Sequence, residues 1–457
     1  MNRPAPDLTA FLQEVRDIPC TTAADQLRMK SRDFYWYSPI LQEQLAERRA
    51  EAVVSPRTEE EVLAVARAAA LHGVPLTVRG GGTGNYGQCV PLAGGVVLDV
   101  TGLNQLLELR PGLARVQAGL RLGVLQQQAH AQGQQLLMYP STLRAATVGG
   151  FIAGGSAGIG SIRNGILKDP GNVLSARVVT LEAQPRVLTL EGEQVQKVHH
   201  AYGTNGIITE ITLALQPRVE WRHVITVFDS YAAASRFCTE LPGSGIDLFL
   251  LTSVERGFSR YYTHIEKVFP AGRDAVFAMV APESLEAYAA LGARCGGVQT
   301  MALTERELHE QRLPPAYECA YNHTTLQALK IDKGWTYLQF EHPHPFDPTL
   351  CVRLKERWGD EFLAHDEFLR TREDPLSAYG LPLVRFTTPE RQYEIMRALE
   401  AEGCVVFDPH VYTIEDGGMK TIDQVQLDFK RQADPAGLMN PGKMRAWEES
   451  GAGRKAA

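Results

Sequence analysis

The sequence predicts an α+β protein with two domains, and three observations lead to this fold class. The chain has 457 residues, which is more than one hydrophobic core usually supports. In its first half, a helical pattern, a strand pattern and a long glycine run follow one another before residue 90. After Pro217, strand patterns alternate with helical patterns, which predicts an antiparallel sheet with helices on one face.

The composition limits the classes of partner. A hydrophobic content of 44% is typical of a globular protein, and a net charge of −7 without a long basic cluster argues against nucleic acid or an anionic membrane. The N-terminus lacks the pattern of a signal peptide, and no apolar run reaches the roughly 20 residues of a membrane span. The seven cysteines are scattered and never form a CxxC pair, which predicts reduced thiols and no zinc or iron–sulfur site. We therefore expect a cytoplasmic protein, with an iron–sulfur partner on another polypeptide left open.

The N-terminal segment, residues 1–45, contains the aromatic run MKSRDFYWYSPI at 29–40. We expect its four aromatic side chains to pack onto the body of the protein, the alternative being a place beside a substrate channel. A helix is predicted after Thr58, because Thr58 and Glu61 have capping-box spacing. Gly73 is placed to end this helix, and Val74–Val78 is predicted to be the next strand.

The glycine run RGGGTGNYG at 79–87 follows that strand. Consecutive glycines leave backbone N–H groups that can surround a pyrophosphate, so the run predicts a phosphate-bearing cofactor. It contains a GxGxxG match, but the next segment, QCVPLAGGVVLDV, predicts a strand where the Rossmann fingerprint needs a helix. A Walker loop is excluded as well, because no Lys-Ser or Lys-Thr pair closes the run. A flexible surface turn is the remaining alternative.

Three further motifs accompany this loop. They are PSTLRAATVGGFIAGGSAGIGSIRNGILKDPGNV at 140–173, AYGTNGIITEITLALQP at 201–217 and DFKRQADPAGLMNPGKM at 428–444. Together the four motifs resemble the FAD-binding domain of the vanillyl-alcohol oxidase and PCMH superfamily, which includes glycolate oxidase FAD subunits. The resemblance covers most of residues 46–217 and about the last forty residues. It implies a two-part PCMH-type FAD-binding domain in which the loop at 140–173 faces the flavin.

The resemblance also implies which residues bind FAD. A backbone group near Ile208 would meet the adenine, and the NPGK segment would bring the chain back to the flavin domain. The implied cofactor-binding residues are Arg79, Gly80, Gly81, Gly82, Thr83, Gly84, Asn85, Ser141, Thr142, Thr147, Gly149, Gly150, Gly154, Gly158, Ile208 and Asn440.

We expect FAD to be bound without a covalent link to either loop. In berberine-bridge and cytokinin-type relatives a His follows the glycines, and this chain has Thr83 there. No Cys lies between Tyr139 and Gly160, where a second link would fall. A link from the cap is left open.

The motifs also predict the domain boundaries. The FAD-binding domain spans 46–217 and an α+β cap with an antiparallel sheet spans 218–403. The cap ends in a helix after Thr388, and the strand CVVFDPHVY begins a segment, 404–446, that returns to the FAD domain. Residues 447–457 are predicted to be a disordered tail.

Oxidation of an alcohol or hydroxy acid by flavin requires a base near the substrate hydroxyl. The PxGHxGDGNxH metal motif of the D-lactate branch is missing, and the nearest pattern, EHPHP with His342 and His344, more closely fits a surface loop, so no metal is predicted. His410 follows the returning strand and is our first candidate for the base or a substrate ligand, followed by Tyr412. The alternative is a buried, hydrogen-bonded histidine.

The run YECAYNHTTLQALK at 317–330 offers a second group of polar side chains. Tyr321 and His323 could line the substrate site from the cap, or the run could be a helix start capped by Asn322 or Thr324. The pair His199-His200 is expected to be solvated or one layer removed from the site.

These patterns predict an FAD-dependent oxidoreductase that transfers a hydride from a small polar substrate, a hydroxy acid or alcohol, to flavin N5. The electron acceptor is not identified, and a partner subunit is possible. Two alternatives remain: a non-catalytic FAD-binding subunit of a glycolate-oxidase-like complex, and a UDP-sugar reductase of the MurB kind.

Overall fold

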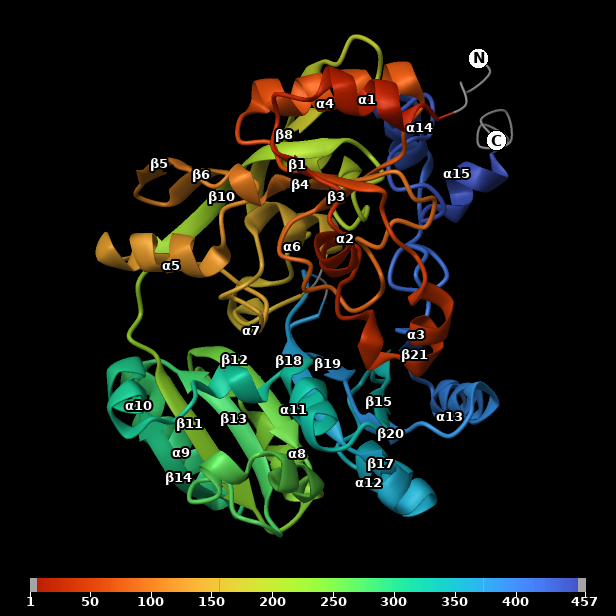
Figure 1. Cartoon of the computed structure of the whole chain (residues 1–457). Helices are drawn as coiled ribbons and strands as arrows, with labels where there is room; N and C mark the ends of the chain where they lie inside the picture. The colour runs from red at the N-terminus through yellow and green to blue at the C-terminus, as the bar shows by residue number, and fades with distance from the viewer. Residues whose placement is uncertain (1–5, 156, 373, 451–457) are drawn as a thin grey trace. The chain divides into compact units, whose positions relative to one another are not determined.

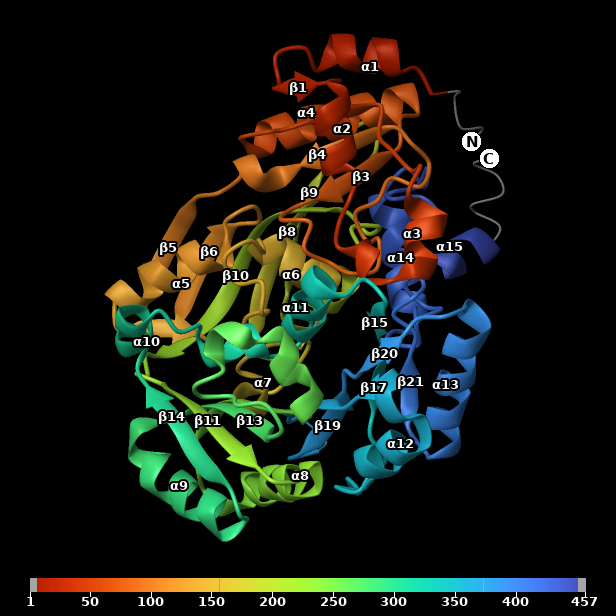
Figure 2. The same cartoon turned by 60° about the horizontal axis from the view of Figure 1, so that its bottom comes forward.

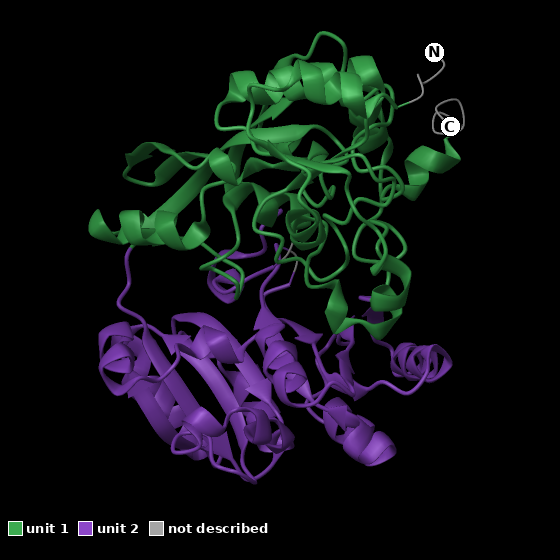
Figure 3. Cartoon of the chain, in the orientation of Figure 1, with its two compact units in different colours: residues 1–156, 170–217, 410–457 green, residues 157–169, 218–409 purple. Residues whose placement is uncertain are grey.

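The computed structural model describes residues 6–155, 157–372 and 374–450. The chain divides into two compact units (Figure 3). Unit 1 consists of residues 1–156, 170–217 and 410–457, and unit 2 of residues 157–169 and 218–409. The predicted α+β class is confirmed. Part of the predicted flavin-facing loop, 157–169, belongs to unit 2.

The first sheet of unit 1 is built around parallel strands, and it contains the strand that leads into the glycine run. Its order is β1-β2-β4-β3, with β1 (Cys20–Thr21) antiparallel to β2 (Ala52–Val54), and with β4 (Val96–Asp99) parallel to both β2 and β3 (Leu76–Arg79). The helices of this part are α1 (Leu8–Glu14), α2 (Ala24–Lys30), α3 (Pro39–Leu45) and α4 (Glu59–His72). Helices α1 and α4 lie together (Figure 1), and both contribute to the hydrophobic core of this sheet.

Helix α4 shows how well local signals predict this region. The Thr58 side chain accepts the amide of Glu61, and Gly73 ends the helix with a φ of 64°. The capping box is incomplete, because the Glu61 carboxylate accepts the amide of Arg57 and not that of Thr58. The following strand starts at Leu76, two residues later than predicted.

The second sheet of unit 1 is antiparallel. Its order is β5-β6-β10-β8-β9, and β7 also pairs with β10. The strands are β5 (Leu106–Arg110), β6 (Leu113–Gln117), β7 (Gln134–Leu136), β8 (Val173–Val179), β9 (Val187–Glu191) and β10 (Ile207–Pro217). Helices α5 (Leu122–Ala131), α6 (Val148–Gly154), α14 (Gln424–Ala433) and α15 (Arg445–Glu449) complete unit 1. Helix α15 therefore extends three residues into the predicted tail, and residues 451–457 of that tail lie outside the described residues.

The remaining parts of unit 1 bear on two predictions. The aromatic run of the N-terminal segment packs on the body, since Tyr35 joins Leu41, Leu45 and Val90 in a buried cluster. His199 and His200 are only 6% and 7% exposed, so the first of the two predicted alternatives, a solvated pair, is wrong, and a place one layer removed from the site stays a prediction. His200 packs directly on the backbone of Gly155, since a Cβ atom added to this glycine would lie only 2.1 Å from Cβ of His200.

Unit 2 is built on an antiparallel sheet of eight strands in the order β14-β11-β13-β12-β18-β19-β16-β21. The strands are β11 (Arg222–Phe228), β12 (Leu248–Val254), β13 (Asp274–Val280), β14 (Val298–Leu303), β16 (Gln339–Glu341), β18 (His365–Leu369), β19 (Ser377–Gly380) and β21 (Val405–Phe407). A smaller sheet has the order β15-β20-β17, formed by β15 (Trp335–Tyr337), β20 (Leu383–Arg385) and β17 (Phe362–Leu363).

Helices cover both faces of the large sheet. Helices α8 (Tyr231–Glu240) and α9 (Leu285–Arg294) pack on one face (Figure 2), where Phe237 and Leu291 join the core beneath the strands. Helix α11 (His323–Ile331) lies on the other face, because it is bonded to His365 of β18, whose neighbour Asp366 points to α8. The prediction of helices on one face was therefore incomplete. The other helices of unit 2 are α7 (Ser161–Asn164), α10 (Glu305–Gln311), α12 (Leu350–Trp358) and α13 (Pro389–Ala401). Among the described residues, we find no helix with the length and apolar character needed to span a bilayer.

Candidate functional site

The glycine run begins where β3 ends, and several of its backbone amides have no acceptor among the described residues. Within the part of the chain that the structure describes, the amides of residues 81–84 donate to no protein acceptor. Gly82 has a φ of +63°, which favours glycine. Four successive amides without an acceptor form a group of donors suited to an anion.

The glycine run at 79–87 and the first part, 140–150, of the predicted flavin-facing loop at 140–173 lie against each other in unit 1. A carbon built on Gly80 would lie 2.2 Å from Oγ1 of Thr147, and one on Gly81 would lie 2.3 Å from the Ala145 carbonyl oxygen. The Thr142 hydroxyl also donates to Oγ1 of Thr83 at 3.3 Å. Glycine is therefore required at 80 and 81 by the contact between the loops, a reason that the sequence did not reveal.

A buried group of charged side chains lies next to the glycine run. The Arg79 guanidinium packs so closely on Gly82 that a Cβ atom added to this glycine would lie 1.5 Å from Nη1 of Arg79. The same Nη1 lies 3.8 Å from the Cys89 sulfur. Burial raises the pKa of Asp33 and lowers that of Lys443, while the two groups stabilise each other's charge. Burial also raises the pKa of the Cys89 thiol to about 12. Nε of Arg79 is buried and has no hydrogen-bond partner among the described residues.

The predicted NPGK contacts hold the C-terminal segment to this loop. Asn440 donates to the carbonyl oxygens of Gln88 and Tyr202 at 2.8 and 2.7 Å, and Lys443 donates to the Gly87 carbonyl at 2.6 Å. Both hydrogen bonds come from the side-chain NH2 group of Asn440, which therefore binds backbone carbonyl groups of the chain. A direct contact of Asn440 with a cofactor stays a prediction.

The other predicted cofactor residues fall into two groups. In unit 1, Thr147 caps α6 by accepting the amide of Gly150. Ile208 lies in β10 opposite Val178, beside a bulge in the ladder. Gly158 lies in unit 2. Unit 1 also contains Asn85, Ser141, Gly149 and Gly154.

His410 is the first residue of the C-terminal part of unit 1 and is 1% exposed. Its Nδ1 lies 2.8 Å from the Ser38 hydroxyl, which also accepts the amide of Leu41. Tyr412 is partly buried in the same cluster as Tyr35, and the Lys443 ammonium lies 5.0 Å from its ring centroid. Of the four predicted catalytic residues, Tyr412 is therefore close to the charged group beside the glycine run, and His410 is bonded to Ser38 of the N-terminal segment.

The other two candidates lie in unit 2. The Tyr321 phenol donates to the Gly158 carbonyl at 2.9 Å, and burial raises the pKa of the phenol well above its usual value. Tyr321 is thus a better hydrogen-bond donor than base. His323 starts α11 with its Nδ1 2.8 Å from a Glu318 carboxylate oxygen. Asn322 occupies the N-cap position of α11 without a capping bond from its side chain, so the predicted Asn322 cap is wrong.

Sequence reasoning missed a group of buried polar residues around Tyr321. The Glu367 carboxylate accepts the amide of Tyr321 and the hydroxyl of Thr252, both at 2.5 Å, and lies 2.8 Å from Nε2 of His365. The available signal was the run His-Asp-Glu between apolar residues at 365–367, since consecutive charged residues are unusual in a buried strand.

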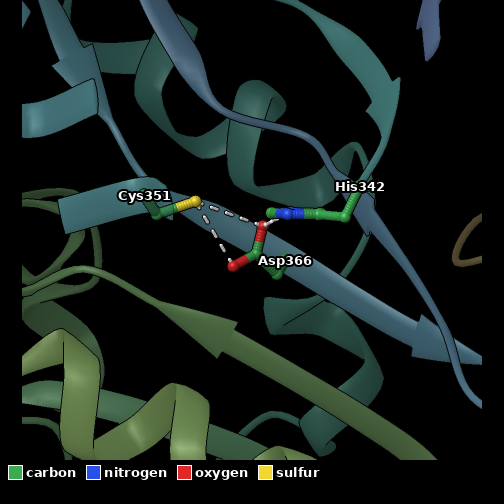
Figure 4. A group of neighbouring side chains, drawn as sticks. All are labelled: His342, Cys351 and Asp366. Atoms are coloured by element: carbon green, nitrogen blue, oxygen red, sulfur yellow. Dashed lines mark hydrogen bonds and ion pairs between the residues drawn. The ribbon is translucent and has the colours of Figure 1, made fainter. Parts of the chain in front are cut away.

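A second buried group lies on the α8 face of β18 (Figure 4). Asp366 lies 2.7 Å from Nε2 of His342 and accepts from the Cys351 thiol and, at 2.8 Å, from the Tyr231 phenol. One ligand atom of each of His342, Cys351 and Asp366 falls within 4.8 Å of the others, a spacing that a metal ion could use. The carboxylate already has three donors, and Nδ1 of His342 has no partner among the described residues, whereas a metal-bound histidine normally donates its second N–H. We interpret the group as a hydrogen-bonded network of the core. His344 of the EHPHP pattern is 75% exposed at its side chain and lies 3.3 Å from Asp374.

A model of the FAD binding domain matches residues 50–190, which include both loops. These residues belong to the FAD binding domain family.

Curated relatives resemble the same part of the chain. The D-lactate dehydrogenase of Anaerostipes hadrus is 31% identical over 183 residues, which is 37% of this chain and 37% of the relative. Glycolate oxidase subunit GlcD of Escherichia coli K12 is 28% identical over 205 residues, 42% of this chain and 40% of the relative. The similarity to these relatives thus spans about two fifths of their length.

The likeness in fold extends further than the FAD binding domain. A solved structure of alkyldihydroxyacetonephosphate synthase superposes with a TM-score of 0.72 at 16% identity, covering 96% of this chain and 87% of that one. At this identity the match shows the fold of both units and nothing of the chemistry.

The residues of the FAD binding domain fit the cofactor that the family name implies. The four unpartnered amides at 81–84 have the chemistry to donate to pyrophosphate oxygens, and the Arg79 guanidinium beside them adds positive charge with one N–H unused among the described residues. The domain therefore supplies both the backbone donors and the charge that a dinucleotide diphosphate needs.

Proposed function

We propose that the protein is an FAD-dependent oxidoreductase that oxidises a small 2-hydroxy acid or alcohol. The observation that carries the proposal is the loop of unpartnered amides at 81–84 within a recognised FAD binding domain. The names of two relatives, D-lactate dehydrogenase and a glycolate oxidase subunit, support a hydroxy acid as the substrate class. Bound FAD would supply the hydride acceptor.

The proposal gives each part of the chain a task. The amides at 81–84 and Arg79 bind the diphosphate, and Thr142 and Thr147 fix the second loop against them. His410 would accept the substrate hydroxyl proton on Nε2. This requires the tautomer in which Nδ1 is protonated and its N–H donates a hydrogen bond to the Ser38 hydroxyl.

We also propose that FAD is bound non-covalently and that the protein is cytoplasmic. Thr83 supports the first point, since a threonine hydroxyl occupies the place of the linking histidine and is bonded to Thr142. We propose a partner subunit as the acceptor of the electrons, since the GlcD relative is itself named as a subunit.

A substrate screen tests the proposal. The purified protein would be mixed anaerobically with D-lactate, L-lactate or glycolate, and the loss of the flavin absorbance near 450 nm would be followed by a stopped-flow measurement. Turnover with a redox dye or with oxygen would then identify the class of acceptor. Reduction by one hydroxy acid is the expected result, whereas reduction by NADPH and by none of the acids would favour the UDP-sugar reductase alternative.

A further inference from the structure

Tyr321 has a backbone conformation that is uncommon for a residue with a side chain. Its φ is +50°, in the left-handed region, which is unfavourable for a residue with a side chain. Such a conformation persists only when the surrounding contacts determine it. The reason for the conformation should therefore lie in the groups that bind the Tyr321 backbone.

Both backbone polar groups of Tyr321 are held by one buried network. The amide donates to Oε1 of Glu367 at 2.5 Å, and the carbonyl accepts from the Thr324 hydroxyl at 2.8 Å. Thr324 in turn lies 3.0 Å from Nδ1 of His365, and Nε2 of His365 lies 2.8 Å from the same Glu367 oxygen. The network thus closes a ring from the amide of Tyr321 back to its carbonyl.

The side chain of Tyr321 connects this network to the segment 157–169. Its phenol donates to the Gly158 carbonyl at 2.9 Å. Two further contacts hold the segment. The Arg163 guanidinium forms a bidentate ion pair with the Asp247 carboxylate, at 2.7 and 2.9 Å, and the Gly160 amide donates to the Phe249 carbonyl. Tyr321 thus holds the segment at its first residues.

We propose that Glu367 is a positioning residue, which holds the Tyr321 backbone so that the phenol fixes the Gly158 carbonyl at the start of the segment 157–169. The importance of this position for flavin rests on the proposed function, in which Gly158 is one of the expected cofactor-binding residues. The effect of Glu367 passes through Tyr321, so Glu367 does not touch the reacting atoms.

Two matched pairs of variants test the proposal. Tyr321→Phe removes the phenol hydroxyl that binds Gly158, while Tyr231→Phe removes a buried phenol hydroxyl on the opposite face of the same sheet. Glu367→Leu removes the acceptor of the Tyr321 amide, and Glu367→Gln keeps an amide oxygen that can accept it. Thr324→Val, which frees the Tyr321 carbonyl, serves as a second route if Glu367→Leu does not fold.

The first measurement is hydrogen exchange of the holoenzyme, read by mass spectrometry for peptides that cover 157–160. We expect exchange at least fivefold faster in Tyr321→Phe, Glu367→Leu and Thr324→Val than in the wild type. Tyr231→Phe and Glu367→Gln should stay within twofold of the wild type. The double variant Tyr321→Phe/Glu367→Leu should exchange no faster in this segment than the faster of its two single variants, because both act on one contact.

The second measurement is the visible circular dichroism of bound FAD, which reports the surroundings of the flavin ring. The spectrum should change in Tyr321→Phe, Glu367→Leu and Thr324→Val. In Glu367→Gln it should equal the wild-type spectrum. Unchanged exchange at 157–160 in Tyr321→Phe and Glu367→Leu would overturn the proposal. A wild type that D-lactate, L-lactate and glycolate all fail to reduce would count against the proposed function and leave the exchange result as a valid test of Glu367.

Discussion

Gly82 is the residue at which a single substitution should separate flavin binding from folding. Its positive φ leaves little freedom for a side chain, and a carbon built on Gly82 would lie 1.5 Å from Nη1 of Arg79. Gly82→Val should displace Arg79 and the neighbouring amides, so the purified protein should contain less than a tenth of the wild-type flavin. The measurement is the ratio of absorbance at 450 nm to that at 280 nm.

Gly133→Val is the matched control for that experiment. Gly133 has a φ of +68°, and a carbon built on it would meet no atom within 4 Å, so this variant shares the backbone cost of about 1–2 kcal/mol without the clash. It should retain full flavin occupancy. Equal flavin loss in both variants would show that the strain, and not the loop geometry, is responsible.

His410 should matter for the reaction and not for holding the flavin. His410→Asn can keep a hydrogen bond to Ser38 but cannot accept a proton at working pH, so flavin reduction should slow by roughly 10² or more. Rapid mixing with the substrate found in the screen measures this rate, and the flavin content should not change. A wild-type rate would move attention to Tyr412 and then to His323.

At the scale of residues, the sequence predicts what a local pattern encodes. The glycine run, Thr58 and Gly73 each depend on neighbours within a few positions, and the structure places each in the predicted turn or cap. Asp33 and Glu367 could not be found in the same way, because each also contacts residues far along the chain: Cys89 for the first, Thr252 and Tyr321 for the second. No periodicity encodes such contacts.

Strand β11 contains a histidine that links stability to pH. His223 is 3% exposed, its Nδ1 accepts the Ala316 amide, and burial lowers its pKa to about 4. The unfolded chain takes up a proton near pH 6.5 and the folded chain only near 4, so this stability is fully present above 6.5 and is lost as the pH falls toward 4. The loss should be about 3 kcal/mol when complete.

His223→Gln should remove most of that dependence, since glutamine can accept the Ala316 amide and does not titrate. Calorimetric melting between pH 7 and 4.5 should therefore show a smaller fall in Tm for His223→Gln than for the wild type. Exposed His309, changed to Gln, is the control and should behave as the wild type. An equal fall in all three proteins would assign the acid sensitivity to other groups.

At the scale of elements, hydrophobic periodicity and end signals located α13 after Thr388 and the strand at 405–407. The face of the sheet that α11 covers was not predictable. An amphipathic pattern shows which side of a helix is buried, but both faces of this sheet are buried, one against α8 and the other against α11.

The whole molecule should hold its flavin without a covalent bond. Thr83 is bonded to Thr142, and the nearby thiol of Cys89 stays protonated because its pKa is raised to about 12, so neither is a nucleophile for a flavin methyl group. Precipitation with trichloroacetic acid should leave the yellow colour in the supernatant. A fluorescent flavin band that migrates with the protein on a denaturing gel would contradict this and indicate a link from another residue.

At the scale of the whole chain, the four motifs predict that segments far apart in the sequence form one domain, and three of the four motifs lie wholly in unit 1. The placement of 157–169 in unit 2 was not predictable. The segment is short, and its membership depends on contacts with residues such as Asp247 and Phe249 that lie about eighty positions later.

The return of the chain to unit 1 at His410 has a consequence for synthesis on the ribosome. Strand β3 is bridged at Leu76 to Met439, and Asn440 ties together the carbonyl groups of Gln88 and Tyr202. Unit 1 therefore cannot be completed until residues 410–457 are synthesised, which happens only after the whole of 218–409 has been translated. At roughly 5–20 residues per second this delay is on the order of 10–40 s. During that time the unpaired glycine loop and its apolar sheet are available to chaperones and proteases, so premature termination anywhere before residue 440 should yield a chain that the cell removes.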